Sequence, residues 1–305
     1  MEAHSNWICC VAFSPVDAKT LATASSDDTV RIWTLSEDGK TSTLRHRLSD
    51  HTHWVRSIAW SNDGLFLVSG SYDHTIRKWN ISTGECELTI EARISNRVNA
   101  VALSPDNKHV VSGHVDFISE ECFIYVWDVA TGDKILGPLK GHRRNVVTVV
   151  YSPDGRHILS GSRDGFVIVW DSTTGDILFG PFATHSNSVW SISFHPSGET
   201  FITGSSDKTL TIWDAINFKP IHKNIHVHGA SVYSVQYSPD GASLLSAEED
   251  GTLRLSDAKK GRPTCVSVQN GYAVYSVTFS PDGRWVASGG MGRNVRIWEV
   301  RHLVL

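Results

Sequence analysis

The 305-residue sequence lacks an excess of basic charge, a long apolar run and a regular set of cysteines, and each absence excludes a class of protein. With 28 basic and 32 acidic residues, it does not have the charge of a general nucleic-acid binder. No apolar run approaches the roughly 20 residues that span a bilayer, and Met1 does not begin a signal peptide. Its five cysteines are odd in number and match no zinc spacing, which favours reduced thiols in a cytoplasmic or nuclear protein.

Helical periodicity of useful length is also absent, and a repeat of short strands takes its place. Tryptophan recurs at Trp33, Trp79, Trp127, Trp170 and Trp213, at intervals of 46, 48, 43 and 43 residues. The next interval, to Trp298, is 85 residues, and Ser256 stands 43 residues into it. Counting Ser256 as a replaced tryptophan gives seven repeats. A period in the low forties is typical of propeller blades.

Each repeat contains an alternating strand, a turn, a second strand, an Asp-containing turn, a third strand and a weaker fourth strand. Pro-Asp-Gly turns follow the first strand in VVTVVYSPDG (146–155), VYSVQYSPDG (232–241) and VYSVTFSPDG (274–283). The sequence therefore predicts an all-β fold, a seven-bladed β-propeller of four-stranded antiparallel blades that forms one domain over 1–305. The repeats are centred near 4–48, 49–91, 92–140, 141–183, 184–226, 227–268 and 269–305.

The two ends of the chain leave the last blade short of residues. Only Met-Glu-Ala precedes His4, and only EVRHLVL follows Trp298, which is too short for a turn and a full strand. We therefore expect the last blade to lack its outer strand. Because an exposed strand edge invites pairing, we also expect the sequence to be part of a larger chain or complex.

The segments RDGFVIVWD (163–171), SDKTLTIWD (206–214) and SDDTVRIWT (26–34) carry the Trp-Asp dipeptide or its variants. From end to end the chain resembles the WD40-repeat β-propeller family. Two segments, TGDKILGPLKGH (131–142) and TTGDILFGPF (173–182), are loosely similar to WD-repeat arrays of fungal nucleotide-binding receptor-type proteins.

The resemblance implies a polar network in each blade, made of a His before the first strand, a Ser or Thr on the second, an Asp in the next turn and the Trp on the third. The candidates are His4, Thr23, Asp27 and Trp33; His51, Ser69, Asp73 and Trp79; His142, Ser160, Asp164 and Trp170; His185, Thr203, Asp207 and Trp213; and His228, Ser246 and Asp250, with Ser256 for Trp.

Two repeats depart from this pattern. The third has Ile94 in place of the His, with Asp116 left to hold the turn, and the seventh has Asn270 and Gly292 for His and Asp. Incomplete turn networks predict that these two blades are locally the least rigid.

A Ser-His-Asp set is also what a hydrolase triad requires. Here the set recurs blade after blade at the same offsets, whereas an active site is usually unique, and no G-x-S-x-G elbow accompanies it. The histidines His222, His226 and His228 lie close together in sequence, but no carboxylate or Cys completes a metal site. We therefore expect no catalytic residues, no metal and no cofactor.

The resemblance further implies that partners bind at one mouth of the central channel, where three positions of each repeat project. Residues at these positions include Trp7, Trp54, Arg56, Tyr72, Arg97, Arg163, Trp190, Tyr233, Glu249 and Tyr275. Aromatic residues and arginine anchor many protein interfaces. Trp190 is the strongest single candidate, because it breaks the alternation of SVWSISF while Val189 and Ile192 supply the packing.

These residues predict a non-catalytic interaction scaffold or sensor that binds a protein or peptide. The arginines in repeats 2 to 4 favour an acidic group on the ligand, and the aromatics in repeats 5 to 7 favour an apolar one. A substrate-recruiting subunit of a ubiquitin-ligase or chromatin complex is the alternative, and a hydrolase is a remote one. We expect neither nucleic acid nor membrane as a partner.

Overall fold

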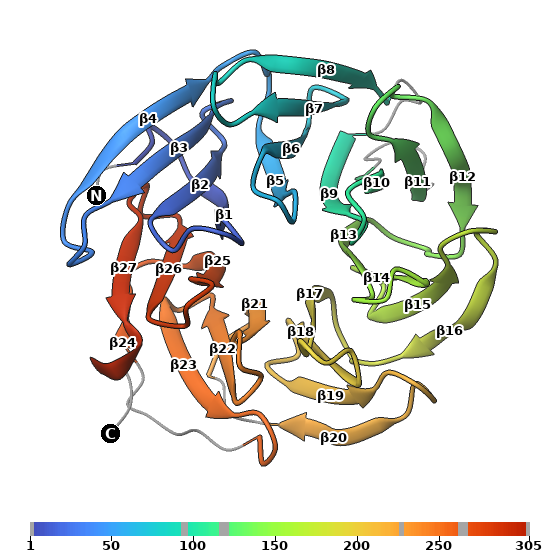
Figure 1. Ribbon diagram of the computed structural model, residues 1–305. Coiled ribbons are helices and arrows are strands. Elements are labelled where there is room, and N and C mark those ends of the chain that lie inside the picture. Colours follow the sequence, from blue (N-terminus) through green and yellow to red (C-terminus); the bar gives the residue numbers. More distant parts are fainter. Residues whose placement is uncertain (1–2, 93–96, 116–121, 226–228, 262–267, 303–305) are drawn as a thin grey trace.

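In the computed structural model, which describes residues 3–92, 97–115, 122–225, 229–261 and 268–302, seven antiparallel sheets stand around a central channel (Figure 1). Six sheets have four strands and the last has three, and within each sheet the strands follow one another in sequence order. The structure thus confirms the seven-bladed propeller and the short last blade. Each sheet is one blade, whose strands run from the channel to the rim.

The first three blades consist of β1 (Ile8–Phe13), β2 (Thr20–Ser25), β3 (Val30–Leu35) and β4 (Ser42–Leu48); β5 (Val55–Trp60), β6 (Phe66–Ser71), β7 (Thr75–Asn80) and β8 (Cys86–Glu91); and β9 (Arg97–Leu103), β10 (His109–Val115), β11 (Phe123–Asp128) and β12 (Lys134–Lys140). Blades 4 and 5 consist of β13 (Val146–Tyr151), β14 (His157–Ser162), β15 (Phe166–Asp171) and β16 (Ile177–Ala183); and β17 (Val189–Phe194), β18 (Thr200–Ser205), β19 (Leu210–Asp214) and β20 (Pro220–Ile225). Blades 6 and 7 consist of β21 (Val232–Tyr237), β22 (Ser243–Glu248), β23 (Thr252–Asp257) and β24 (Val268–Gln269); and β25 (Val274–Phe279), β26 (Trp285–Gly290) and β27 (Arg296–Glu299), which the 3-10 turn Val300–His302 follows.

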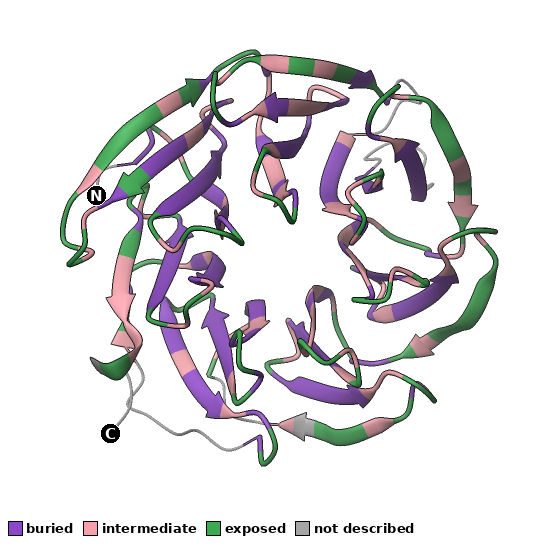
Figure 2. Ribbon diagram, viewed as in Figure 1, coloured by how far each residue is buried: buried purple, intermediate pink, exposed green. Residues whose placement is uncertain are grey.

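Burial increases toward the middle of each blade and decreases toward the rim (Figure 2). The second strands are buried on both faces, because neighbouring blades cover them, and they are therefore rich in small and apolar residues. The outer strands face solvent, as β16 illustrates. Each hydrophobic cluster fills the space between two blades; Ile32 of blade 1, for example, packs in one cluster with Leu67 and Trp79 of blade 2.

Hydrogen bonds join the inner strands of neighbouring blades around the channel. The Val235 N–H donates to Ser191 Oγ over 3.1 Å, from blade 6 to blade 5. The same bond recurs from Val11 N–H to Ser276 Oγ, at 3.1 Å, and this pair crosses the junction between the first and last blades. The ring is therefore closed at the channel even though the outer part of blade 7 is incomplete.

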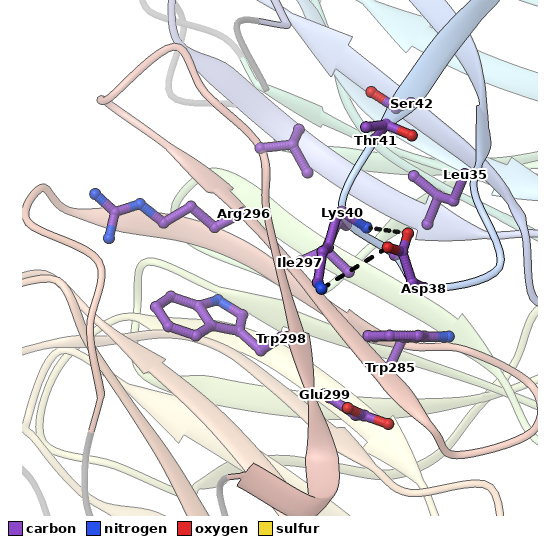
Figure 3. Close-up of a pocket in the computed structure, with 12 residues that line it drawn as sticks. Leu35, Asp38, Lys40, Thr41, Ser42, Trp285, Arg296, Ile297, Trp298 and Glu299 are labelled. Atoms are coloured by element: carbon purple, nitrogen blue, oxygen red, sulfur yellow. Dashed lines mark hydrogen bonds and ion pairs between the residues drawn. The ribbon is translucent and has the colours of Figure 1, made fainter.

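Among the described residues no fourth strand covers β27, and a groove lies beside it (Figure 3). A cavity of about 460 Å³ lies between β27 and the turn that links β3 to β4. Gly39, at the tip of this turn, has a positive φ of 65°, and a Cβ there would meet the Trp285 ring at 2.8 Å. Trp298 of β27 is partly exposed, whereas the equivalent tryptophans of blades 1 to 5 are buried.

Candidate functional site

Four blades contain the same buried polar network, and blade 4 shows its geometry. Ser160 Oγ lies 2.8 Å from His142 Nε2 and accepts the Trp170 Nε1 hydrogen over 2.8 Å. His142 Nδ1 lies 3.1 Å from Asp164 Oδ2. Equivalent contacts join His4, Thr23, Asp27 and Trp33; His51, Ser69, Asp73 and Trp79; and His185, Thr203, Asp207 and Trp213.

These networks hold the aspartates ionised. Burial alone would raise the pKa of Asp207, but hydrogen bonds from His185, Thr209 and the Ser186 backbone bring that pKa well below its usual range. The same forces lower the pKa of Asp27, Asp73 and Asp164. The Ser160 side chain is fully buried and its oxygen is occupied by Trp170, so it is not available as a nucleophile.

Blades 3 and 7 keep the serine-centred part of the network with other partners. Ile94 and Asp116 lie outside the described residues, but His114 of β10 contacts Ser112 Oγ through Nε2 at 2.8 Å. Trp127 Nε1 donates to the same hydroxyl over 2.8 Å, so the imidazole comes from the second strand rather than from the preceding loop. In blade 7, Asn270 lies 3.1 Å from Ser288 Oγ, which also accepts the Trp298 indole hydrogen over 3.2 Å.

Blade 6 has a different set of polar contacts. His228 lies outside the described residues, and Ser246 Oγ is buried without a hydrogen-bond partner among the residues that are described. The fully buried Glu248 accepts backbone hydrogens from Gly229 and Ala230 at 3.0 and 3.2 Å and the Arg254 Nε hydrogen at 2.7 Å. Glu248 thus accepts the backbone hydrogens of the preceding loop that the turn Asp accepts elsewhere, while Asp250 keeps the turn bond from the Thr252 N–H at 2.9 Å. The network predicted for His228, Ser246 and Asp250 stays a prediction, because His228 is not described.

A β-bulge near the start of every inner strand explains how side chains reach the channel mouth. In β17, Val189 pairs with Ser205 and Ser191 with Gly204, so Trp190 has no partner residue on β18. A bulge redirects the side chain of its extra residue. The extra residues of the seven inner strands, in order, are Cys9, Arg56, Asn99, Val147, Trp190, Tyr233 and Tyr275.

Six aromatic rings follow one another around the mouth and form what we name the aromatic arc: Trp190, Tyr233, Tyr275, Trp7, Trp54 and Tyr72. Neighbouring ring centroids lie 5.3 to 6.5 Å apart, mostly edge to face, a favourable arrangement for aromatic pairs. An arginine lies at each end, since Arg163 lies over Trp190 at 5.1 Å and Arg56 over Tyr72 at 5.6 Å. The Trp190 Nε1 hydrogen is donated to Ser206 Oγ over 2.6 Å, which fixes this ring.

The arc borders a cavity of about 320 Å³ at the mouth. All seven bulge residues line it, together with Trp7 and Arg163. Six of the ten residues predicted to bind a partner therefore meet there: Trp7, Arg56, Arg163, Trp190, Tyr233 and Tyr275. Trp190 is only partly buried, so it remains accessible.

The other four predicted residues lie outside the cavity lining. Trp54 stands on the rim beside Trp7, and Arg97 lies over the Tyr72 ring at 5.2 Å. Tyr72 is buried and donates its hydroxyl hydrogen to Asn99 Oδ1 over 3.0 Å, so it supports the mouth from within. Glu249 is exposed near Tyr233, and burial together with this carboxylate raises the pKa of Tyr233 to about 12.

The described part of the chain offers no group of three His, Cys, Asp or Glu side chains placed to hold a metal ion, although His226 and His228 are not described. Within the same residues, no helix is long and apolar enough to cross a membrane.

The ring of seven sheets and its repeated networks define a β-propeller whose exposed mouth is lined by aromatic residues and arginine. The family model for the WD domain, G-beta repeat, matches residues 1–34, 42–80, 84–128, 133–171, 178–214, 218–257 and 263–299. The chain belongs to the WD40-repeat family.

Similar proteins share only part of the chain. The cross-pathway control WD-repeat protein 2 of Flammulina velutipes is 33% identical over 85 residues, which are 28% of this chain and 27% of that protein. The small ribosomal subunit protein RACK1 of Drosophila melanogaster is 31% identical over 84 residues, 27% of this chain and 26% of that protein. Coatomer subunit beta'-1 of Arabidopsis thaliana is 33% identical over 107 residues, 34% of this chain and 11% of that protein. The matches thus span about a quarter of the first two relatives and about a tenth of the third.

Proposed function

We propose that this protein is a non-catalytic scaffold or sensor that binds a partner protein or peptide at the channel mouth. The observation that carries the proposal is the aromatic arc, in which rings from four blades, Trp190, Tyr233, Tyr275 and Trp7, line one cavity rather than pack separately. Monomeric surfaces seldom gather so many large aromatic side chains without a partner, and Trp and Tyr dominate binding hot spots.

The relatives' names support this proposal, since two describe subunits of larger assemblies, the small ribosomal subunit and coatomer. The arginines at both ends of the arc favour an acidic partner. The free cysteines Cys9, Cys10, Cys86 and Cys122 fit a reducing, cytoplasmic or nuclear setting.

Affinity capture with matched variants tests the proposal. Trp190→Ala removes the ring at one end of the aromatic arc, and Ile216→Ala removes an apolar side chain that is 80% exposed between β19 and β20 on the rim. We expect Trp190→Ala to lose at least about ten-fold of the bound partner, as truncated hot-spot residues do. Ile216→Ala should retain it. Equal capture by Trp190→Ala and wild type would contradict a binding site at the mouth.

A further inference from the structure

Arg56 has no ion pair among the described residues, whereas three other partly buried arginines do. Arg31, Arg77 and Arg254 each face a carboxylate: Asp27 at 3.5 Å, Asp50 at 3.7 Å and Glu248 at 2.7 Å. Arg56 faces none among the described residues. Its contacts are Cys9 Sγ at 3.3 Å, Asn99 Oδ1 at 3.4 Å and the Tyr72 ring.

A guanidinium withdrawn from water without a counter-charge is costly, and proteins retain such groups where an anion meets them. A guanidinium carries five N–H donors. Asn99 takes the Nε hydrogen of Arg56 and Cys9 takes one Nη1 hydrogen, so three donors remain for a ligand. This number suffices for a bidentate bond to a carboxylate or phosphate.

The guanidinium is also held in place. Asn99 Oδ1 accepts the Tyr72 hydroxyl hydrogen over 3.0 Å, and Asn99 Nδ2 donates to the Val146 backbone oxygen over 3.4 Å. Because Asn99 is fixed by two further bonds, Arg56 loses little freedom when it binds a ligand. Arg163 lines the same cavity from the opposite end of the aromatic arc.

We propose that Arg56 is the receptor for a single oxyanion side chain of the partner, a carboxylate or a phosphate, which enters the mouth cavity while the neighbouring partner residue packs on the aromatic arc. This inference rests on the proposed function, because it assigns the chemistry of the group that the mouth admits. A motif with one acidic or phosphorylated residue next to an apolar or aromatic one has the matching chemistry.

A displayed library of random twelve-residue peptides, selected on the wild-type chain, supplies the probe. Dissociation constants are then measured by fluorescence anisotropy for the strongest peptide, for its analogue with the acidic residue changed to the amide, and for a phosphoserine analogue. The proteins are wild type, Arg56→Met, Arg56→Lys, Trp190→Ala and the control Arg156→Met, in which the replaced arginine side chain is 82% exposed after β13.

We expect the selected peptides to carry an acidic residue, and the amide analogue to bind wild type about 10- to 100-fold more weakly. For Arg56→Met, the dissociation constants of the acidic peptide and its amide analogue should agree within about three-fold. Arg56→Lys keeps the charge and should keep the preference for the acidic peptide, so it tests the site even if Arg56→Met does not fold. Arg156→Met should bind both peptides as wild type does. Tighter binding of the phosphoserine analogue identifies phosphate as the source of the anion, and weaker binding identifies carboxylate.

Neutral selected peptides, or equal affinity of the acid and amide peptides for wild type, would overturn the inference. The outcome with Trp190→Ala separates this failure from that of the proposed function. Peptides that need Trp190 but ignore Arg56 contradict the oxyanion site alone, whereas peptides that ignore Trp190, or a library with no binder at all, contradict the binding mouth itself.

Discussion

The substitution of the same strand serine by alanine should lower the free energy of unfolding in one blade and leave it almost unchanged in another. In blade 4, Ser160→Ala removes the oxygen that accepts the Trp170 indole hydrogen and contacts His142 Nε2, both at 2.8 Å. The Ser160 and Trp170 side chains are essentially inaccessible to water, so the indole N–H and the imidazole nitrogen are left unsatisfied. Each unsatisfied buried group costs about 1–3 kcal/mol, so we expect a loss of about 2–4 kcal/mol. In blade 6, Ser246 is equally buried but its hydroxyl has no partner among the described residues, so Ser246→Ala should change the free energy of unfolding by less than about 0.5 kcal/mol or increase it.

Urea unfolding, followed by tryptophan fluorescence, measures both variants against wild type. A change in the midpoint at constant slope reports a change in stability. The expected result is a clear fall of the midpoint for Ser160→Ala and little or no fall for Ser246→Ala. Equal falls in the two variants would refute the assignment of the networks, because the same atom is removed from the same position of β14 and β22.

Three further predictions concern the networks and the turns. His114→Phe keeps an aromatic ring but removes the contact with Ser112 Oγ. We expect it to lower the free energy of unfolding, measured in urea, by about 1–2 kcal/mol. An unchanged midpoint would mean that the contact between His114 and Ser112 does not stabilise blade 3. Asp207→Asn should lower the free energy of unfolding at pH 7 and lower it less toward pH 3. Folding lowers the pKa of Asp207 below its unfolded value of about 3.9, so the ionised carboxylate stabilises the fold above that pH, and this stabilisation is lost as the pH falls toward the folded pKa. A cost that does not change with pH would contradict this prediction. Gly290→Ala places a Cβ 2.0 Å from the Ala273 backbone oxygen and should cost at least about 1–3 kcal/mol, more than Gly292→Ala, whose Cβ meets only the Tyr272 ring at 3.0 Å; thermal melts that rank the two variants the other way would contradict this.

The number of blades and strands was predictable because the same turn chemistry recurs in each repeat. Pro-Asp-Gly and the Asp-containing turns divide the chain into short strands at a nearly constant period. These signals are local, and they survive without any knowledge of packing.

The contacts of His114 in blade 3 and of Glu248 in blade 6 were not predicted, because the pattern of the other repeats places the network histidine in the loop before the first strand. His114 and Glu248 both stand two residues after the network serine, inside strands that are buried after their first residue. An imidazole or a carboxylate in a continuous run of buried residues requires a partner, and this was the available signal.

The mouth was predictable in part. The break in alternation at Trp190 was visible in the sequence, and the bulge in β17 gives its physical cause. The sequence does not reveal that Tyr72 turns inward to Asn99, or that Arg56 meets Asn99 and Cys9 rather than a carboxylate within the described part of the chain, because both depend on side chains from neighbouring blades.

Chemical footprinting tests the central claim, that partners bind at the channel mouth, most directly. Hydroxyl-radical oxidation rates of Trp190, Tyr233 and Trp7 are compared with those of Phe179 and Ile216, in the free chain and with the captured partner bound. Phe179 of β16 and Ile216, between β19 and β20, are exposed on the rim, at 44% and 80%. We predict several-fold protection of Trp190, Tyr233 and Trp7 but not of Phe179 and Ile216; unchanged oxidation of the three mouth residues, with protection of Phe179 or Ile216, would contradict the account.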